Sequence, residues 1–415
     1  MKATYVFTPN KSPDVTYVGD QLEVKKTTLF DSLETGGSVI SLSGPSKSGK
    51  TVFVEKVLGK HRLVPVTGAG VDSTGRFWER VFDKLGVAIK KSRSTASGTK
   101  TSAKGGISGG LEKVLKVEIG GGKEFSKQES ESADYTTDYL QLAISKLGDT
   151  NLVIFIDDFH YIPSSVQSEL CKELKVAAQK NVNFICASVP YHSDDTIIAN
   201  PDLRGRVTLL DFDYWCEDEL KKIAYRGFNA LNIDVQVSLI DAMASEAAGS
   251  PQLMQALCLN ACFESSIREM AKTRQKIVSN LEFIKNICIR TAATTDYSSI
   301  VEQIEDGPKL EDKNTTNYIV LNDNIENIYT LILRAIAYQP PELTIRFRNM
   351  QSRIEKVCNK NPPGITQISK ACIQLTSIAN DLSNASVAEW DEEADVLDIR
   401  DPYFLFYLRW GRFQT

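Results

Sequence analysis

Cysteine and histidine are scarce in this sequence. Its 415 residues include eight cysteines and three histidines, and so few cysteines exclude a small fold held together by disulfides. Cys258 and Cys262 lie one helical turn apart, a spacing that would suit a pair of metal ligands. No histidine lies near them, so we interpret both as small buried hydrophobic residues. Cysteine usage of this kind is typical of the reducing cytoplasm.

Long apolar runs and an excess of positive charge are also missing. No run approaches the roughly 18 apolar residues of a membrane span, and the N-terminal residues lack the apolar stretch of a signal peptide. The formal net charge is -5, so the chain as a whole does not attract nucleic acid or anionic lipid. Such binding would need a local basic patch. We expect a cytoplasmic protein without a membrane partner.

Short apolar strands alternate with helices over the first half of the chain. The composition, 42% hydrophobic and 24% charged residues, is that of a globular protein, and 415 residues are enough for two or three packed units. Because the strands are continuous apolar runs, they predict an α/β fold with a parallel sheet covered by helices on both faces. A helix is expected at 20–35, and strands at 38–42, 63–66, 152–156, 182–187 and 206–210.

A glycine-rich loop lies between the first of these strands and a helix at 51–58. It reads Gly44-Pro45-Ser46-Lys47-Ser48-Gly49-Lys50-Thr51, and the strand–loop–helix order is the context that a phosphate-binding P-loop requires. Gly44 and Gly49 let successive backbone N–H groups converge on a phosphate at the helix N-terminus. We predict nucleotide binding by every residue of this loop and by Val52.

Two side chains of the loop and two carboxylates have specific expected roles. Lys50 should reach the β- and γ-phosphates, and Thr51 should ligate Mg²⁺ through its hydroxyl. The strand at 152–156 ends in Asp157 and Asp158, where the ligands of parallel sheets bind. Asp157 would hold Mg²⁺ through water, and Asp158 would orient or deprotonate the attacking water. Because an aspartate reaches less far than a glutamate, we expect slow hydrolysis.

Further polar residues border the last two strands. Ser188 follows the apolar run at 182–187 and is placed to sense the γ-phosphate or the attacking water. Arg204 and Arg206 stand just before the last strand, where a guanidinium could stabilise transition-state charge in cis or across a subunit interface. Arg206 is the better candidate because it abuts the strand. A surface salt bridge is the alternative interpretation of this arginine.

The pattern divides the chain into four parts. Residues 1–212 form the expected ATPase core, interrupted at about 90–132 by a Gly-, Ser- and Lys-rich insertion that is interpreted as a hairpin on a flexible stem or as a disordered loop. Residues 213–293 predict a helical lid, and residues 294–322 are polar and linker-like. Residues 323–415 predict a winged-helix domain, with helices at 325–338, 347–357 and 365–379 and a hairpin at 387–390 and 396–399.

Together these motifs resemble those of the AAA+ and STAND groups of P-loop ATPases, in particular the origin-recognition-like branch that includes prokaryotic STAND proteins. The resemblance covers residues 17–293 and, more loosely, the C-terminal domain. It implies ATP as the nucleotide and places Pro251 of the lid near the adenine, with Tyr17 and Val18 on its other side. At the lid position where AAA+ proteins have an arginine, this chain has Pro251-Gln252, which favours a switch over a continuously cycling motor.

Three functions compete on this basis. The first is an ATP-dependent switch with slow hydrolysis that controls oligomerisation or a separate effector protein, a class that includes prokaryotic antiviral defence proteins. The second is a DNA-binding ATPase of initiator or transposition-regulator type; a modest basic excess on the C-terminal helices favours it, and the carboxylates at 391–395 oppose it. The third is a module that binds nucleotide without hydrolysing it. The sequence favours the first, with DNA as a less favoured partner.

Overall fold

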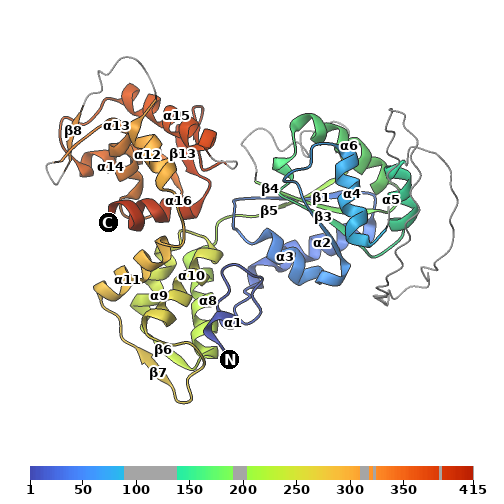
Figure 1. Ribbon diagram of the computed structural model, residues 1–415, viewed down its shortest axis with the longest axis horizontal. Coiled ribbons are helices and arrows are strands. Elements are labelled where there is room, and N and C mark those ends of the chain that lie inside the picture. The colour runs from blue at the N-terminus through green and yellow to red at the C-terminus, as the bar shows by residue number, and fades with distance from the viewer. Residues whose placement is uncertain (88–137, 190–202, 309–316, 321–323, 383–385, 415) are drawn as a thin grey trace, which may run out of the picture.

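The computed structural model describes residues 1–87, 138–189, 203–308, 317–320, 324–382 and 386–414. These residues form a sheet-containing core, a helical body beside it and a C-terminal body, which Figure 1 shows from one side. The expected insertion at 90–132 lies outside the described residues. Within the described ranges, no helix combines the length and the apolarity needed to cross a membrane.

A five-stranded sheet, all of whose pairings are parallel, forms the core of the first body. The order across the sheet is β2-β3-β4-β1-β5, so the strand that leads into the P-loop is an inner one. The inner strands are buried along nearly their whole length, as a sheet covered on both faces requires. The predicted parallel sheet is therefore confirmed. Its strands are Val39–Ser43 (β1), Leu63–Thr67 (β2), Val153–Asp157 (β3), Asn183–Ser188 (β4) and Val207–Asp211 (β5).

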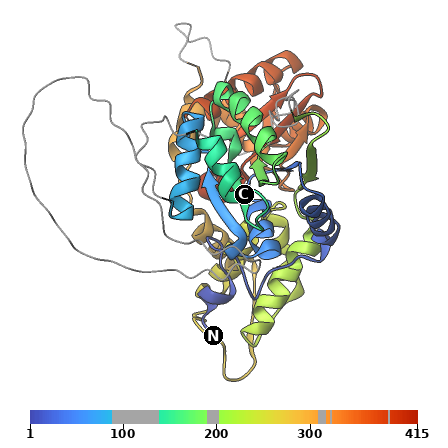
Figure 2. The same ribbon diagram turned by 90° about the vertical axis from the view of Figure 1, so that its right-hand side faces the viewer.

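Helices cover both faces of this sheet, as the two views in Figures 1 and 2 show. Alternate strand residues point to opposite faces: Ile154 packs in the cluster that contains α4, α5 and α6, whereas Phe155 packs in the cluster that contains α2 and α3. The helices are Glu23–Thr35 (α2), Lys50–Leu58 (α3), Thr74–Leu85 (α4), Tyr139–Leu147 (α5) and Ser164–Ala178 (α6), with 3-10 turns at Asp20–Leu22 (η1), Lys60–Arg62 (η2) and Phe159–Tyr161 (η3).

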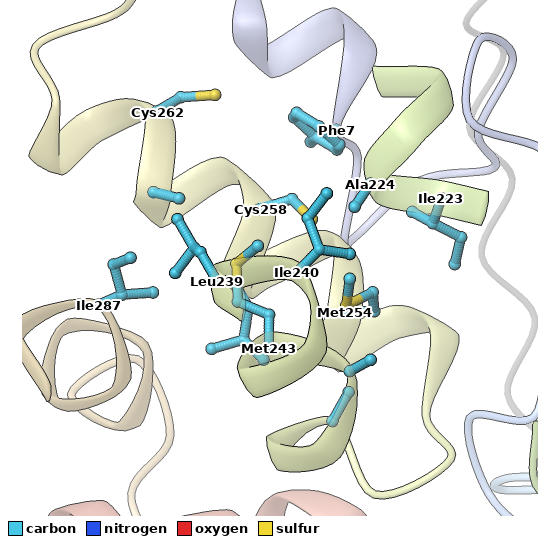
Figure 3. Close-up of a cluster of buried hydrophobic side chains, with 14 of the residues drawn as sticks. Phe7, Ile223, Ala224, Leu239, Ile240, Met243, Met254, Cys258, Cys262 and Ile287 are labelled. Atoms are coloured by element: carbon cyan, nitrogen blue, oxygen red, sulfur yellow. The ribbon is translucent and has the colours of Figure 1, made fainter. Parts of the chain in front are cut away.

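The second body is helical, and the N-terminal residues of the chain take part in its core. Figure 3 shows Phe7 pointing into a cluster of apolar side chains that includes Met243 and Cys258. Burial raises the pKa of the Cys258 and Cys262 thiols, and no cluster of three or more His, Cys, Asp or Glu side chains that could hold a metal ion occurs among the described residues. The elements are Ala3–Val6 (α1), Glu217–Ala230 (α8), Ile233–Val235 (β6), Val237–Glu246 (α9), Pro251–Glu264 (α10), Gln275–Ile277 (β7) and Leu281–Ala292 (α11).

The third body packs helices against two small antiparallel sheets. One sheet has the order β10-β13-β12 and contains the terminal hairpin expected from the sequence; the other has the order β11-β8-β9. The elements are Ser298–Asp306 (α12), Tyr318–Val320 (β8), Ile325–Glu326 (β9), Ile328–Ala337 (α13), Thr344–Arg346 (β10), Phe347–Val357 (α14), Cys358–Lys360 (β11), Ile365–Leu382 (α15), Ala388–Asp391 (β12), Val396–Ile399 (β13), Pro402–Tyr407 (α16) and a π-helical turn at Leu408–Phe413 (η5).

The segment expected to be a linker at 294–322 differs from that expectation. It contains α12, whose Val301 and Ile304 are buried in the core of the C-terminal body. These two side chains lie three residues apart, so they share one face of the helix. The C-terminal body therefore begins before residue 323.

A buried ionic network joins the helical body to the C-terminal body. Glu246 at the end of α9 accepts hydrogen bonds from Arg409 at 2.7 and 3.0 Å and from the indole N–H of Trp410 at 2.7 Å. The side chain of Arg409 is fully buried. Because buried charges are costly unless they are paired, this network holds the two bodies in one arrangement.

Candidate nucleotide-binding site

The P-loop connects β1 to α3 at the edge of the sheet where the strands end. Gly44 and Gly49 have φ values of 151° and 100°, a region that favours glycine because it lacks a Cβ. A Cβ on Gly44 would lie 2.2 Å from the carbonyl oxygen of Phe212, so the loop begins in close contact with the chain that follows β5. Residues 44–49 therefore form a turn that leads directly into the N-terminus of α3, which begins with Lys50, Thr51 and Val52, a geometry suited to an anion.

Lys50 is the first residue of α3, and its side chain reaches back to the start of this turn. Its ammonium donates hydrogen bonds to the carbonyl oxygens of Gly44 at 2.8 Å and of Pro45 at 2.7 Å. Burial lowers the pKa of Lys50 to about 8, while the nearby carboxylates of Asp157 and Asp158 oppose that shift. Lys50 is thus a buried cation that faces the carboxylates at the end of β3 and is held by two backbone oxygens, which a phosphate group could replace.

Thr51 and Asp157 meet as the sequence predicts for a metal site. The Thr51 hydroxyl donates to Oδ2 of Asp157 at 2.8 Å, and the other carboxylate oxygen accepts from the backbone N–H of Asp158 at 3.1 Å. Burial raises the pKa of Asp157 above its ordinary value, and the hydrogen bond from Thr51 opposes that change. A hydroxyl and a carboxylate are hard oxygen ligands of the kind that Mg²⁺ takes, so these residues fit such an ion.

Asp158 follows at the same edge with a left-handed backbone, φ 55°. Burial raises its pKa, and the charge of Lys50 opposes the shift. Next to it, His160 accepts a hydrogen bond at its Nδ1 from the backbone N–H of Val189, at 3.4 Å. His160 therefore joins the end of β3 to the residue that follows β4, and its neighbours hold it in place.

Ser188 lies at the same edge of the sheet, between the ends of β1 and β3. It is the last residue of β4, and in the register it stands beside Ser43, the residue before the P-loop. On its other side β4 pairs with β3, the strand that ends in Asp157. Ser188 is buried. The sheet order thus brings together the P-loop, the two aspartates and Ser188.

Arg206 does not lie beside the P-loop, the two aspartates and Ser188. The expectation that it acts on the nucleotide of its own chain is therefore wrong. It precedes β5, which runs parallel to β1 with Val39 opposite Val207 and Ser43 opposite Asp211. Arg206 is therefore at the amino end of the sheet, about 20 Å from the P-loop at roughly 3.3 Å per residue. There its guanidinium donates to the side-chain oxygen of Gln179 at 3.0 and 3.3 Å, once that amide is oriented to satisfy both groups.

Arg204 and Arg206 instead line a groove at this opposite edge. The groove has a volume of about 700 Å³ and is otherwise formed by the end of α2 and the turn before β1. Arg204 is exposed and Arg206 is half-buried. Both side chains are accessible to a second molecule rather than to the P-loop of their own chain.

The residues expected beside the adenine lie between the core and the helical body. Val18 is buried in the core of the helical body, and the carbonyl of Tyr17 accepts a hydrogen bond from Arg226 of α8. The ring of Tyr17 lies 5.8 Å from the ammonium of Lys56 on α3. Pro251 is the first residue of α10, which Ser250 caps. Tyr17 and Val18 thus connect α3 to the helical body, and their place beside an adenine stays a prediction, as does that of Pro251.

Two contacts of the P-loop were not expected from the sequence. The indole N–H of Trp215 donates to the carbonyl of Ser48 at 3.0 Å, while its backbone N–H donates to the carbonyl of Gly249 at 3.0 Å. Lys47 forms an ion pair with Asp401 of the C-terminal body at 2.9 Å. The partners of the loop are 167 and 354 residues away in the chain, and no local motif signals such pairs.

The buried hydroxyl of Ser48 is a further sign of a ligand. It has no hydrogen-bond partner among the residues that the structure describes, although Ser48 is 2% exposed. An unpaired buried hydroxyl is costly, and a phosphate oxygen at the P-loop would satisfy it. This observation and the oxygen pair of Thr51 and Asp157 both fit a nucleotide with a divalent metal.

Comparisons with known proteins support the same fold. No protein-family model and no curated protein matches the sequence. Among solved structures, the ORC2 protein of Aeropyrum pernix, in ADPNP–ADP complexes, is 12% identical over 99% of this chain and 98% of its own, with a TM-score of 0.51. A Walker-type ATPase of Pyrococcus abyssi is 14% identical over 94% of this chain and 96% of its own, with a TM-score of 0.50. This chain has the parallel-sheet fold of the P-loop ATPases.

Proposed function

We propose that this protein binds ATP with Mg²⁺, hydrolyses it slowly and acts as a conformational switch of AAA+/STAND type. The observation that carries the proposal is the convergence of the P-loop, the Thr51–Asp157 pair, Asp158 and Ser188 at one edge of the sheet. Such an arrangement supplies a cradle for phosphate, oxygen ligands for a metal and a carboxylate near the reacting phosphate.

Each side chain has a distinct task in this proposal. Lys50 exchanges its bonds to the Gly44 and Pro45 carbonyls for bonds to the β- and γ-phosphates. Thr51 and Asp157 hold Mg²⁺, which neutralises phosphate charge when it is bound. Asp158, whose pKa is raised by burial, accepts a proton from or orients the attacking water, and Ser188 contacts the γ-phosphate or that water.

The helical body serves as a lid over the nucleotide, and the third body is a winged-helix domain. Two connections support the first assignment. Trp215 bridges the Gly249 turn to the P-loop, and Tyr17 and Val18 lie between α3 and the helical body. The order of α13, α14 and α15 with the β10-β13-β12 sheet supports the second. The output is a change in oligomeric state or in a partner protein, and a role in prokaryotic antiviral defence is one form of it.

Steady-state phosphate release from ATP tests the proposal. Lys50→Ala should lose at least about tenfold in ATP affinity, because a charge-assisted contact contributes about 1.5–3 kcal/mol. Asp158→Asn should retain ATP binding in isothermal titration and lose phosphate release. Wild-type affinity in Lys50→Ala would contradict nucleotide binding at this site. Equal phosphate release by wild-type protein and Asp158→Asn would support a module that binds nucleotide without hydrolysing it.

The DNA-binding alternative loses one of its supports in the structure. Arg353, which contributes to the basic excess of the C-terminal helices, is 4% exposed. Its guanidinium donates to the carbonyls of Tyr338 and Pro340 and pairs with Glu342. Arg353 is therefore a structural residue that cannot contact a phosphate backbone. The same phosphate-release assay with double-stranded DNA decides the matter, because stimulation by DNA would favour the initiator or transposition-regulator function.

A further inference from the structure

Lys47 occupies a position in the P-loop that suits glycine better than lysine. Its φ is 62°, in the left-handed region that non-glycine residues adopt rarely. Such strain persists only where the surroundings fix it, and it is common at switch regions. A lysine at this strained position therefore indicates that its side chain has a specific partner. That partner belongs to the C-terminal body.

Asp401 is built to receive this lysine. The ammonium of Lys47 lies 2.9 and 3.1 Å from the two carboxylate oxygens of Asp401 and 4.2 Å from the ring centroid of Tyr403. Asp401 caps α16 by accepting the backbone N–H of Tyr403 at 3.0 Å, and it accepts the hydroxyl of Tyr297. Hydrogen bonds from the C-terminal body thus fix the carboxylate, and the P-loop supplies the cation.

The ion pair between the C-terminal body and the P-loop is more exposed than the ion pair between the C-terminal body and the lid. The Lys47 and Asp401 side chains are 28% and 20% exposed, whereas Arg409 and Glu246 are 0% and 8% exposed. Water screens the first pair and hardly reaches the second. When the bodies separate, the lid and the C-terminal body should therefore move together, and the Lys47–Asp401 pair should break first.

We propose that Lys47 and Asp401 form a latch that holds the C-terminal body on the P-loop. The phosphates of a bound nucleotide open this latch. The inference rests on the proposed function of the P-loop. Without nucleotide, the carboxylate of Asp401 neutralises the charge of Lys47 in the P-loop. The phosphates of a bound nucleotide are anions that compete with Asp401 for the same ammonium, so binding favours the released state. Linkage is reciprocal. If nucleotide weakens the latch by a given factor, loss of the latch raises nucleotide affinity by the same factor.

Asp401→Asn is the variant that isolates this competition. Asparagine keeps one oxygen, which can cap α16 as Oδ1 of Asp401 does, and it removes the charge that Lys47 requires. Its amide nitrogen takes the place of Oδ2, which accepts from Tyr297, and can donate to the oxygen of the same hydroxyl. Nucleotide affinity is measured by isothermal titration with ADP and with ATP in the Asp158→Asn background. The position of the C-terminal body is measured as the distance between spin labels at Lys84→Cys and Glu393→Cys, in a Cys216→Ser background because Cys216 is the exposed cysteine among the described residues.

We expect Asp401→Asn to bind both nucleotides at least roughly fivefold more tightly than wild-type protein. Without nucleotide, this variant should already show the longer label distance that wild-type protein shows only when nucleotide is bound. Lys47→Gln should show the same longer distance. Asp234→Asn removes the exposed pair with Arg274 on the lid and serves as the matched control, with wild-type affinity and distance.

Two results would overturn the latch. One is an unchanged label distance in both Asp401→Asn and Lys47→Gln; the other is wild-type or weaker nucleotide affinity in Asp401→Asn. Failure of the proposed function has a different signature, because wild-type protein would then bind neither nucleotide. In that case the label distances still report whether the ion pair holds the C-terminal body. The proposal that nucleotide phosphate opens the latch is then rejected.

Discussion

Gly44 illustrates how a single missing side chain permits the P-loop. Any Cβ at this position would meet the backbone oxygen of Phe212 at 2.2 Å, and its φ of 151° disfavours other residues. Gly44→Ala should therefore lower the free energy of unfolding by about 3 kcal/mol and weaken nucleotide binding. Chemical denaturation with and without ATP measures both effects.

Gly49 provides the matched comparison. Apart from its chain neighbours, no atom of the described residues lies within 4 Å of the position that a Cβ would take at Gly49, although its φ is 100°. Gly49→Ala should therefore cost only the backbone strain, about 1–2 kcal/mol. Equal destabilisation by the two substitutions would show that the contact with Phe212 is not what requires glycine at position 44.

The residues of the site differ in how far the sequence could reveal them. The P-loop and Asp157 follow local rules of spacing and strand position, and the structure brings them together. The placement of Arg206 could also have been deduced, because a residue before a parallel strand lies at the edge opposite the ligand site. Trp215 and Asp401 could not, since their contacts with the loop depend on how separate bodies pack.

At the scale of elements, buried strands were the easiest to predict. All five expected strands of the core occur within one residue of their expected bounds, and α14 has the expected bounds. Continuous apolar runs carry a strong signal, whereas the sheet order depends on long-range pairing. Short elements such as β10 were missed because three residues, one of them buried, give no period to recognise.

The joint between α9 and η5 supports a prediction at this scale. Glu246→Ala would leave the buried guanidinium of Arg409 without its carboxylate, and loss of one partner of a buried pair costs about 3–5 kcal/mol. We expect a matching drop in the free energy of unfolding. Replacement of both partners, Glu246→Leu with Arg409→Met, should recover most of that loss.

The exposed pair between Asp234 and Arg274 is the control for this experiment. Its side chains are 52% and 53% exposed, so Asp234→Asn should change stability by less than about 1 kcal/mol. A loss for Glu246→Ala as small as that of Asp234→Asn would show that the buried network does not hold the bodies together.

At the scale of the whole molecule, the position of Arg206 leads to a prediction about assembly. An arginine at the amino end of the sheet can act only on the nucleotide of a second copy, so hydrolysis in trans requires an oligomer. Arg206→Ala should bind ATP normally and release phosphate at least about tenfold more slowly, which corresponds to about 1.4 kcal/mol in the barrier.

Mixing two impaired variants tests this arrangement. Asp158→Asn retains Arg206, and Arg206→Ala retains Asp158, so a mixed oligomer contains some sites with both residues. Phosphate release by the mixture should therefore exceed that of either variant alone. An inactive mixture, or full activity of Arg206→Ala alone, would remove Arg206 from the reaction and leave its contact with Gln179 as its role.

The core of the helical body has a consequence for how this chain is made. Phe7 from the first turn of the chain and Phe406 and Trp410 from α16 and η5 are buried in the same apolar cluster. During synthesis the early residues leave the ribosome long before residues 403–410 exist. The P-loop sheet can fold as a unit while the core of the helical body still lacks the side chains of residues 403–410. The core of the helical body is therefore completed only after residues 403–410 have been synthesised.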